Sequence, residues 1–228
     1  MEIYHEITSS IDAYYRELKT RNSFFVATLT GTLTPQQLAT YIFNLKYTVA
    51  QTIPQCKIGA IRSKEMGFAK LHDYFKLKIN EEAGHDKWAQ EDLENLRNVY
   101  QIDIKMNLCK PMIDLVAHNH NIVQKDPRLY LVYMLFAEYF TVHAGPEFLK
   151  GIEQACGIPK KHISVLAKHV ALDSEHVAEW KHVVEECKVD FTTLHDQAIS
   201  TFLDVMKLYG NFWEYVGISH TKSGNYAA

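Results

Sequence analysis

The chain has 228 residues, of which 47% are hydrophobic and 22% charged, and its net charge is −3. This hydrophobic share supports a packed core and excludes a disordered chain, and the charge balance excludes a general basic field for nucleic acid. The 10 glycines and 6 prolines fall below the usual roughly 7% and 5%, so the many turns of a β-sandwich or barrel are not expected. We expect a single domain over residues 1–228, with a flexible tail at 219–228.

The cysteines and the apolar runs indicate the cellular compartment of the protein. Cys56, Cys109, Cys156 and Cys187 form no C-x-x-C pair, which argues against a zinc ribbon or a thioredoxin-type motif. The longest apolar run, residues 129–137, is too short to cross a bilayer, and the N-terminus lacks the pattern of a signal peptide. We therefore expect a reduced, cytoplasmic protein without a membrane or nucleic acid partner.

Helix signals dominate from the N-terminus onward. The first twenty residues are predicted to be helical, and the capping box at 34–37, with Pro35 at the first helical position, predicts a second helix that Pro54 should kink. Periodic apolar residues and caps at Asp126 and Asp190 predict further helical segments at 63–97, 105–123, 126–156 (with a break at 145–146), 159–188 and 190–215. The prediction is an all-α bundle of about seven helices.

The sequence His169-x-x-x-Asp173-x-x-His176 carries the most specific chemistry. On an α-helix Asp173 lies about 40° to one side of His169 and His176 about 20° to the other, so all three share a face. Val165 and Trp180 share that face and should bury it. Imidazoles and carboxylates are the ligands that iron, manganese and zinc take, and burying them singly is costly. The alternative is a hydrogen-bonded His–Asp–His cluster in the core.

Glu82-x-x-His85 is a second candidate for ligands. Apolar residues surround His85 on its expected helical face, whereas the same spacing at Glu179 and His182 lies off the ligand face. Glu81 lies on the same broad face and could replace Glu82 as the ligand. The alternative for these acids is ordinary helix-surface charge.

Glu138 is the third element, because it stands inside the apolar run 131–140. A carboxylate there must be paired, protonated or metal-bound, and the alternative to a ligand is a Glu bonded to a buried Tyr or Arg. Together the three elements supply three carboxylates and three imidazoles, which suits two metals. The predicted ligands are Glu82, His85, Glu138, His169, Asp173 and His176, with Glu138 the best candidate to bridge the metals.

This set of motifs resembles the haem-oxygenase-like di-metal oxidases, whose fold is shared with thiaminase-like proteins and pyrroloquinoline-quinone synthase. The sequence Gly31–Leu38 resembles the entry to the second helix in this group, and Asn80–Gly84 resembles its acidic turn. The resemblance implies a seven-helix up-and-down bundle, two iron ions, O2 as co-substrate and frequent homodimers. The implied activity is oxidation or oxygenation of a small substrate, such as a fatty acid, an amino acid or an amine.

The chain also departs from some members of that group. A chlamydial member thought to consume one of its own tyrosines has a His seven residues after its Glu, where this chain, counted from Glu81, has Trp88, and Phe24 and Phe25 stand near the place of that tyrosine. Such self-sacrifice is therefore not expected. Two other classes stay open: a metal-free enzyme of thiamin or cofactor metabolism on the same fold, and a non-catalytic interaction module.

Overall fold

The structure is a computed structural model that describes residues 2–103 and 107–220. Across these two ranges the chain forms helices and no β-strand. The elements are α1 (Glu2–Arg21), α2 (Ser23–Leu29), α3 (Pro35–Glu65), α4 (Ala69–Glu81), α5 (His85–Asn98), α6 (Lys110–Lys125), α7 (Pro127–Cys156), a 3-10 turn (Lys160–His162), α8 (Ser164–Glu186) and α9 (His195–Ile218). The predicted all-α fold is confirmed.

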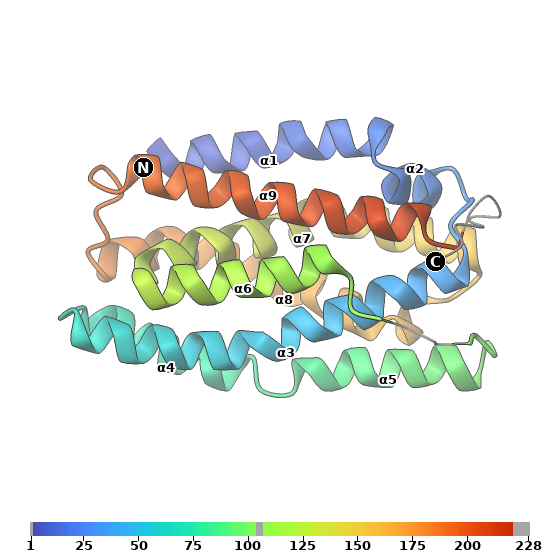
Figure 1. The fold of residues 1–228 in the computed structure, drawn as a ribbon, viewed down its shortest axis with the longest axis horizontal. Coiled ribbons are helices and arrows are strands. Elements are labelled where there is room, and N and C mark those ends of the chain that lie inside the picture. Colours follow the sequence, from blue (N-terminus) through green and yellow to red (C-terminus); the bar gives the residue numbers. More distant parts are fainter. Residues whose placement is uncertain (1, 104–106, 221–228) are drawn as a thin grey trace.

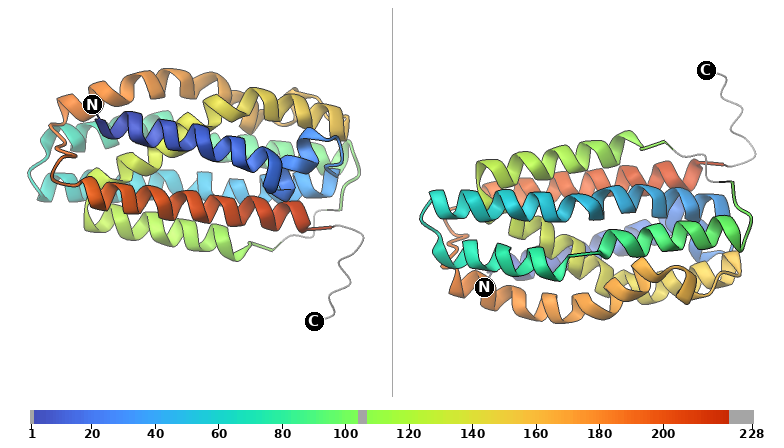
Figure 2. Two further views of the ribbon diagram at one scale, coloured as in Figure 1. Left: turned by 90° about the horizontal axis from the view of Figure 1, so that it is seen from above. Right: turned by 90° about the horizontal axis from the view of Figure 1, so that it is seen from below.

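The helices run roughly parallel to one long axis, and α7 lies at the centre of the bundle (Figures 1 and 2). It packs against α1, α2, α3, α6, α8 and α9. Its first half is buried on every side, because an unbroken apolar run at 129–136 follows the Asp126 cap. Helices α4 and α5 follow one another along one edge of the bundle, beneath α3 (Figure 1). Any polar side chain of α7 that points inward therefore faces several helices at once.

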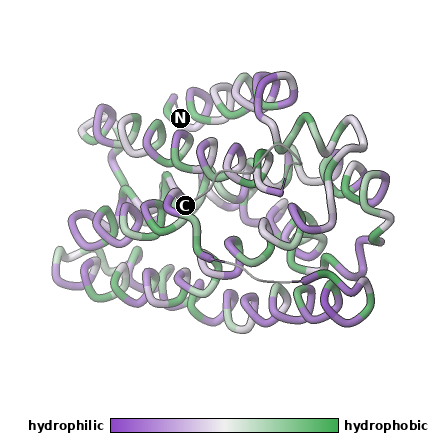
Figure 3. The backbone as a smooth tube through the Cα atoms, turned by 45° about the vertical axis from the view of Figure 1, so that its right-hand side comes forward, coloured by the Kyte–Doolittle hydropathy of each residue, from purple (hydrophilic) through white to green (hydrophobic). Residues whose placement is uncertain are grey.

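Hydrophobic and hydrophilic residues alternate along the coils of most helices, so each presents one apolar face to the bundle (Figure 3). The described residues contain no helix that is long and apolar enough to span a membrane. All four cysteines are free thiols. The observed core is thus built from amphipathic helices around the apolar α7.

The predicted helix over 63–97 is wrong as a single element. The segment is broken twice, between α3 and α4 at Gly67 and between α4 and α5 at Gly84. The φ angles of these glycines, +81° and +91°, are readily adopted only by glycine. α4 and α5 are consequently separate helices. Glu82 is the C-cap that follows α4 and His85 is the first residue of α5, so the two residues flank a turn instead of sharing a helix.

Other boundaries also differ from the predictions. The helix α7 continues through residues 145–146 without the predicted break. Pro54 lies inside α3, as the prediction of a kink within one helix requires. The helix predicted from 159 begins at Ser164 after the 3-10 turn, and the one predicted from Asp190 begins at His195, because the Asp190 side chain caps the turn at Thr192 instead. The short helix α2 was not predicted. α6 begins at Lys110, and residue 105, where it was expected to begin, lies outside the described ranges, as does most of the predicted tail.

One close approach fixes α8 against α7. A Cβ atom added at Gly145 of α7 would lie 2.2 Å from Cγ2 of Val170 on α8. Only glycine therefore lets the two backbones come this near. The contact joins the helix that carries Glu138 to the helix that carries His169, Asp173 and His176.

Candidate metal centre

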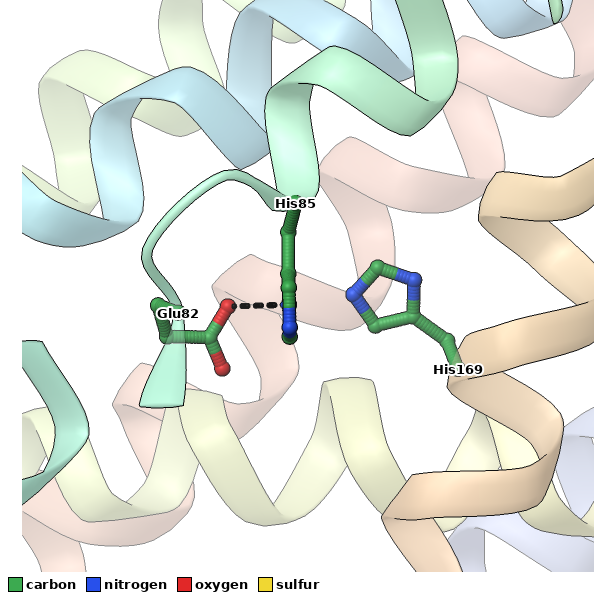
Figure 4. Close-up of side chains that lie close together, drawn as sticks. All are labelled: Glu82, His85 and His169. Carbon is green, nitrogen blue, oxygen red and sulfur yellow. Dashed lines mark ion pairs between the residues drawn. The ribbon is translucent and has the colours of Figure 1, made fainter. Parts of the chain in front are cut away.

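The turn between α4 and α5 brings Glu82 and His85 face to face. Oε2 of Glu82 lies 3.0 Å from Nδ1 of His85, and both side chains are largely buried. The left-handed Gly84 lies in the short turn between them, which places the first residue of α5 beside Glu82 (Figure 4). Nδ1 of His85 is buried but has no hydrogen-bond partner among the described residues. This arrangement leaves a ligand atom of each residue free to share a cation.

His169 on α8 completes this group from the opposite side (Figure 4). Its Nδ1 lies 2.6 Å from the backbone oxygen of Val165, and since a carbonyl can only accept, Nδ1 must donate. Nε2 of the neutral ring is then unprotonated, as a metal ligand requires. Ligand atoms of Glu82, His85 and His169 all lie within 4.8 Å of one another, so a small adjustment of the side chains would bring all three to the distance of about 2.0–2.2 Å at which a metal ion takes such ligands.

A second group of polar side chains surrounds His176. Its Nδ1 lies 3.5 Å from Oδ1 of Asp173 and 3.6 Å from Oε1 of Glu138, and its Nε2 lies 3.8 Å from Oε2 of Glu81. Asp173 and Glu138 are buried, and His176 is mostly so. Buried Nδ1 of His176 and Oε2 of Glu81 have no hydrogen-bond partner among the described residues. Buried imidazole nitrogens and carboxylate oxygens without hydrogen-bond partners form a donor set that suits iron or manganese.

All six predicted ligands therefore lie in one region, in two groups. Glu82, His85 and His169 form the first group, and Glu138, Asp173 and His176 form the second. Glu81, which the sequence left as an alternative to Glu82, contacts the second group instead. Glu179 and His182 are exposed and take no part, as predicted.

Sequence reasoning missed Lys78, which is only 2% exposed. Its Nζ lies 2.9 Å from Oε2 of Glu81 and 3.8 Å from Oε1 of Glu138. The sequence does contain a signal for its burial, because Lys78 follows Leu71 and Phe75 at helical spacing, and all three lie on the buried face of α4. A lysine on such a stripe needs a partner, and the acids of the second group provide it.

Burial and these contacts shift several pKa values. Burial raises the pKa of Glu138 to about 8, against the opposing pull of Lys78. Burial alone would lower the pKa of Lys78, but the carboxylates of Glu138 and Glu81 outweigh it and raise that pKa. The interaction with Asp173 raises the pKa of His176. Burial alone would raise the pKa of Glu82, but His85, His169 and Lys78 together outweigh it and lower that pKa. Glu82 therefore stays ionised, while Glu138 favours its protonated form in the absence of a metal.

An aromatic ring supports the first group from outside. Trp88 stacks on His85 with ring centroids 4.0 Å apart, and the ammonium of Lys168 lies 4.3 Å from the centroid of Trp88. Trp88 also lies edge-on to His169, at 5.7 Å. The indole therefore holds both imidazoles in place and covers them.

A cavity of about 150 Å³ opens onto four of the candidate ligands, Glu82, Glu138, His169 and Asp173. Its other lining residues are mainly apolar or aromatic, including Tyr41, Phe148 and Trp213, and none of the lining residues is Lys or Arg. An apolar cavity of this size can hold a molecule of about the bulk of benzene. The candidate ligands thus form the polar end of an apolar chamber.

Comparison with known proteins finds similarity in structure only. A domain of unknown function with a haem oxygenase-like fold from Shewanella denitrificans superposes with a TM-score of 0.80 over 94% of this chain and 90% of that one, at 17% identity. A CADD-like protein of unknown function from Nostoc punctiforme superposes with a TM-score of 0.69 over 95% of this chain and 98% of that one, at 12% identity. Comparison with models of protein families found no match, and neither did comparison with curated sequences. The chain has the haem oxygenase-like fold that its motifs implied.

Proposed function

We propose that this protein is a non-haem di-iron oxidase or oxygenase that acts on a small substrate. One observation carries the proposal: three carboxylates and three imidazoles from the α4–α5 turn, α7 and α8 lie in one region, and four of these six side chains line an apolar cavity. Bound here, two ferrous ions would supply the activation of O2 for oxidation of a C–H bond or for oxygen transfer. Glu82, His85 and His169 would hold one ion, and Glu138, Asp173 and His176 the other.

The side chains of the site have separable tasks in this proposal. Val165 fixes the tautomer of His169, and Trp88 fixes the ring of His85, so that both imidazoles are oriented before a metal arrives. Glu138 contacts His176 of the second group and lines the same cavity as Glu82 and His169 of the first, which makes it the candidate bridge between the ions. Its proton must leave when a cation binds, because the ion replaces the proton as the partner of the carboxylate.

The cavity lining favours a substrate with an apolar body. No Lys or Arg lines the cavity to pair with a distant anionic group, so a carboxylate of the substrate would have to lie at the metal end. The alkyl or aromatic remainder would pack against the aromatic walls, which also exclude water. Of the substrate classes that the sequence resemblance implies, a short fatty acid suits this lining better than a zwitterionic amino acid.

The thiol chemistry of a metal-free hydrolase is disfavoured. Cys56 is fully buried, and burial raises its pKa to about 12. Burial also raises the pKa values of Cys156 and Cys187 to about 11 and raises that of Cys109. A thiol nucleophile needs a lowered pKa, so these cysteines are poor nucleophiles.

Metal content and O2 uptake test the proposal together. Wild-type protein loaded anaerobically with Fe(II) should bind about two ions per chain and consume O2 on exposure to air. His169→Ala and His176→Ala should each bind about one ion and lose O2 consumption, since each removes a ligand from a different group. His182→Ala removes an exposed imidazole of the same helix and should behave as wild type. Equal effects of all three substitutions, or no iron in the wild type, would overturn the proposal.

A further inference from the structure

Lys78 places a positive charge where the second group of ligands would hold a metal ion. Its ammonium reaches the site from α4 and contacts Glu81 on α4 and Glu138 on α7. Glu82, which follows α4, also acts on its charge, and His176 on α8 contacts the same two acids. Nζ is buried, yet it makes no hydrogen bond of good geometry within the described residues. Its contacts are therefore those of a buried cation held among carboxylates.

The same acids contact both Lys78 and the candidate ligand His176. Oε2 of Glu81 lies 2.9 Å from Nζ and 3.8 Å from Nε2 of His176, and Oε1 of Glu138 lies 3.8 Å from Nζ and 3.6 Å from Nδ1 of His176. A divalent ion bound to these oxygens would lie a few ångströms from the ammonium. Two cations at that separation in a buried site repel strongly. The carboxylate oxygens of Glu81 and Glu138 therefore cannot bind the second metal ion while the Lys78 ammonium stays in its present position.

We propose that the Lys78 ammonium is a built-in competitor for the second metal ion and that it must withdraw before this ion binds. The proposal depends on the proposed metal-binding function. The ion-pair contacts of Lys78 within the described residues are to Glu81 and Glu138, and its charge acts on Glu82 of the first group only at longer range. The first group, Glu82, His85 and His169, therefore binds its ion first. The flexible four-carbon stem of lysine allows the ammonium to leave, and its departure releases Glu81 to join the second group as a ligand. The two ions therefore load in a fixed order, with the second bound more weakly.

Titration with Mn(II), which is stable in air and reports on binding without activity, separates the two sites. The probe is free Mn(II) followed by EPR, with heats measured by calorimetry on the same samples. Wild-type protein should bind one equivalent tightly and a second one more weakly. Lys78→Met keeps the buried apolar stem and removes the charge, so the second site should bind about tenfold or more tightly, while the first site is unchanged. Lys76→Met, which removes an exposed lysine of the same helix, should leave both affinities as in wild type.

A second variant keeps the test decisive if the apolar substitution disturbs the fold. Lys78→Gln retains a polar group without the charge and should also tighten the second site. The proposal would be overturned if both charge-removing variants, shown to be folded by circular dichroism, bound the second Mn(II) no better than Lys76→Met. In that case, tight binding of one Mn(II) per chain in every variant would still support the proposed metal-binding function. No Mn(II) bound to any of them would overturn the proposed function as well.

Discussion

Glu82 and His85 face each other across the turn between α4 and α5, with Oε2 and Nδ1 3.0 Å apart. They belong to two helices that Gly84 separates. Because both side chains approach His169 as well, this turn, rather than one face of a single helix, creates the first metal-binding group. The adjacent Glu81 points to a different partner, His176. Two neighbouring acids thus serve two different groups.

This division makes the two acids experimentally distinguishable. Glu82→Gln should abolish tight binding of the first Mn(II), because it removes an ionised carboxylate that contacts two imidazoles. Glu81→Gln should keep the first site and weaken only the second, by about tenfold to a hundredfold. Calorimetric titration of both variants measures the two affinities. The reverse pattern would exchange the roles of the two acids.

The metal-free protein should lose stability as the pH rises from about 5 to about 8. Burial raises the pKa of Glu138 to about 8, from 4.5 in its ordinary environment, so the folded chain holds a proton that the unfolded chain releases in this range. The free energy of unfolding then falls with increasing pH. His176, whose pKa the interaction with Asp173 raises, acts in the same direction, whereas the lowered pKa of Glu82 acts only below this range.

Urea denaturation of metal-free protein at several pH values within this range measures the effect. Glu138→Gln keeps the size of the side chain and removes its titration, so its stability should depend less steeply on pH. An identical pH dependence in the variant and the wild type would show that Glu138 is ionised throughout.

Gly145→Ala should destabilise the protein although alanine is the better helix former. The added methyl group would meet Val170 at 2.2 Å, and such overpacking costs about 1–3 kcal/mol. The gain in helix propensity of about 0.5–1 kcal/mol offsets only part of this. We expect a net loss of about 1–2 kcal/mol by urea denaturation, together with weaker metal binding, because α8 is pushed away from α7. Adding Val170→Ala should restore most of the loss, and a double variant as unstable as Gly145→Ala would refute the contact.

The helix α8 should gain the most order when metal binds. It buries few of its residues, yet it presents His169, Asp173 and His176 toward the acids of the site. Without metal these groups are incompletely paired, and the cost falls mainly on this helix. Hydrogen exchange at residues 165–180 should slow markedly on addition of Mn(II), and much less in α1. Equal protection of α8 in both states would indicate a preformed site or a purely structural cluster.

The sequence predicted much of this architecture because its strongest signals are local. The apolar run at 129–136 and the caps at Thr34 and Asp126 predicted α3 and α7, and helical spacing correctly placed His169, Asp173 and His176 on one face. The breaks at Gly67 and Gly84 were missed because apolar periodicity continues across them. Lys78 was missed because its role depends on acids from another helix, and the cavity because it forms between helices far apart in the sequence.

Mössbauer spectroscopy of protein loaded with two equivalents of ⁵⁷Fe(II) and then exposed to O2 shows whether the two groups of ligands hold a pair of iron ions that reacts with O2. If the two groups of ligands hold neighbouring ions, most of the iron should appear as a magnetically coupled pair of ferric ions that gives no EPR signal. The pair should vanish in His176→Ala and persist in His182→Ala. Iron present only as isolated paramagnetic ferric ions, or left ferrous after exposure to O2, would contradict a di-iron oxidase.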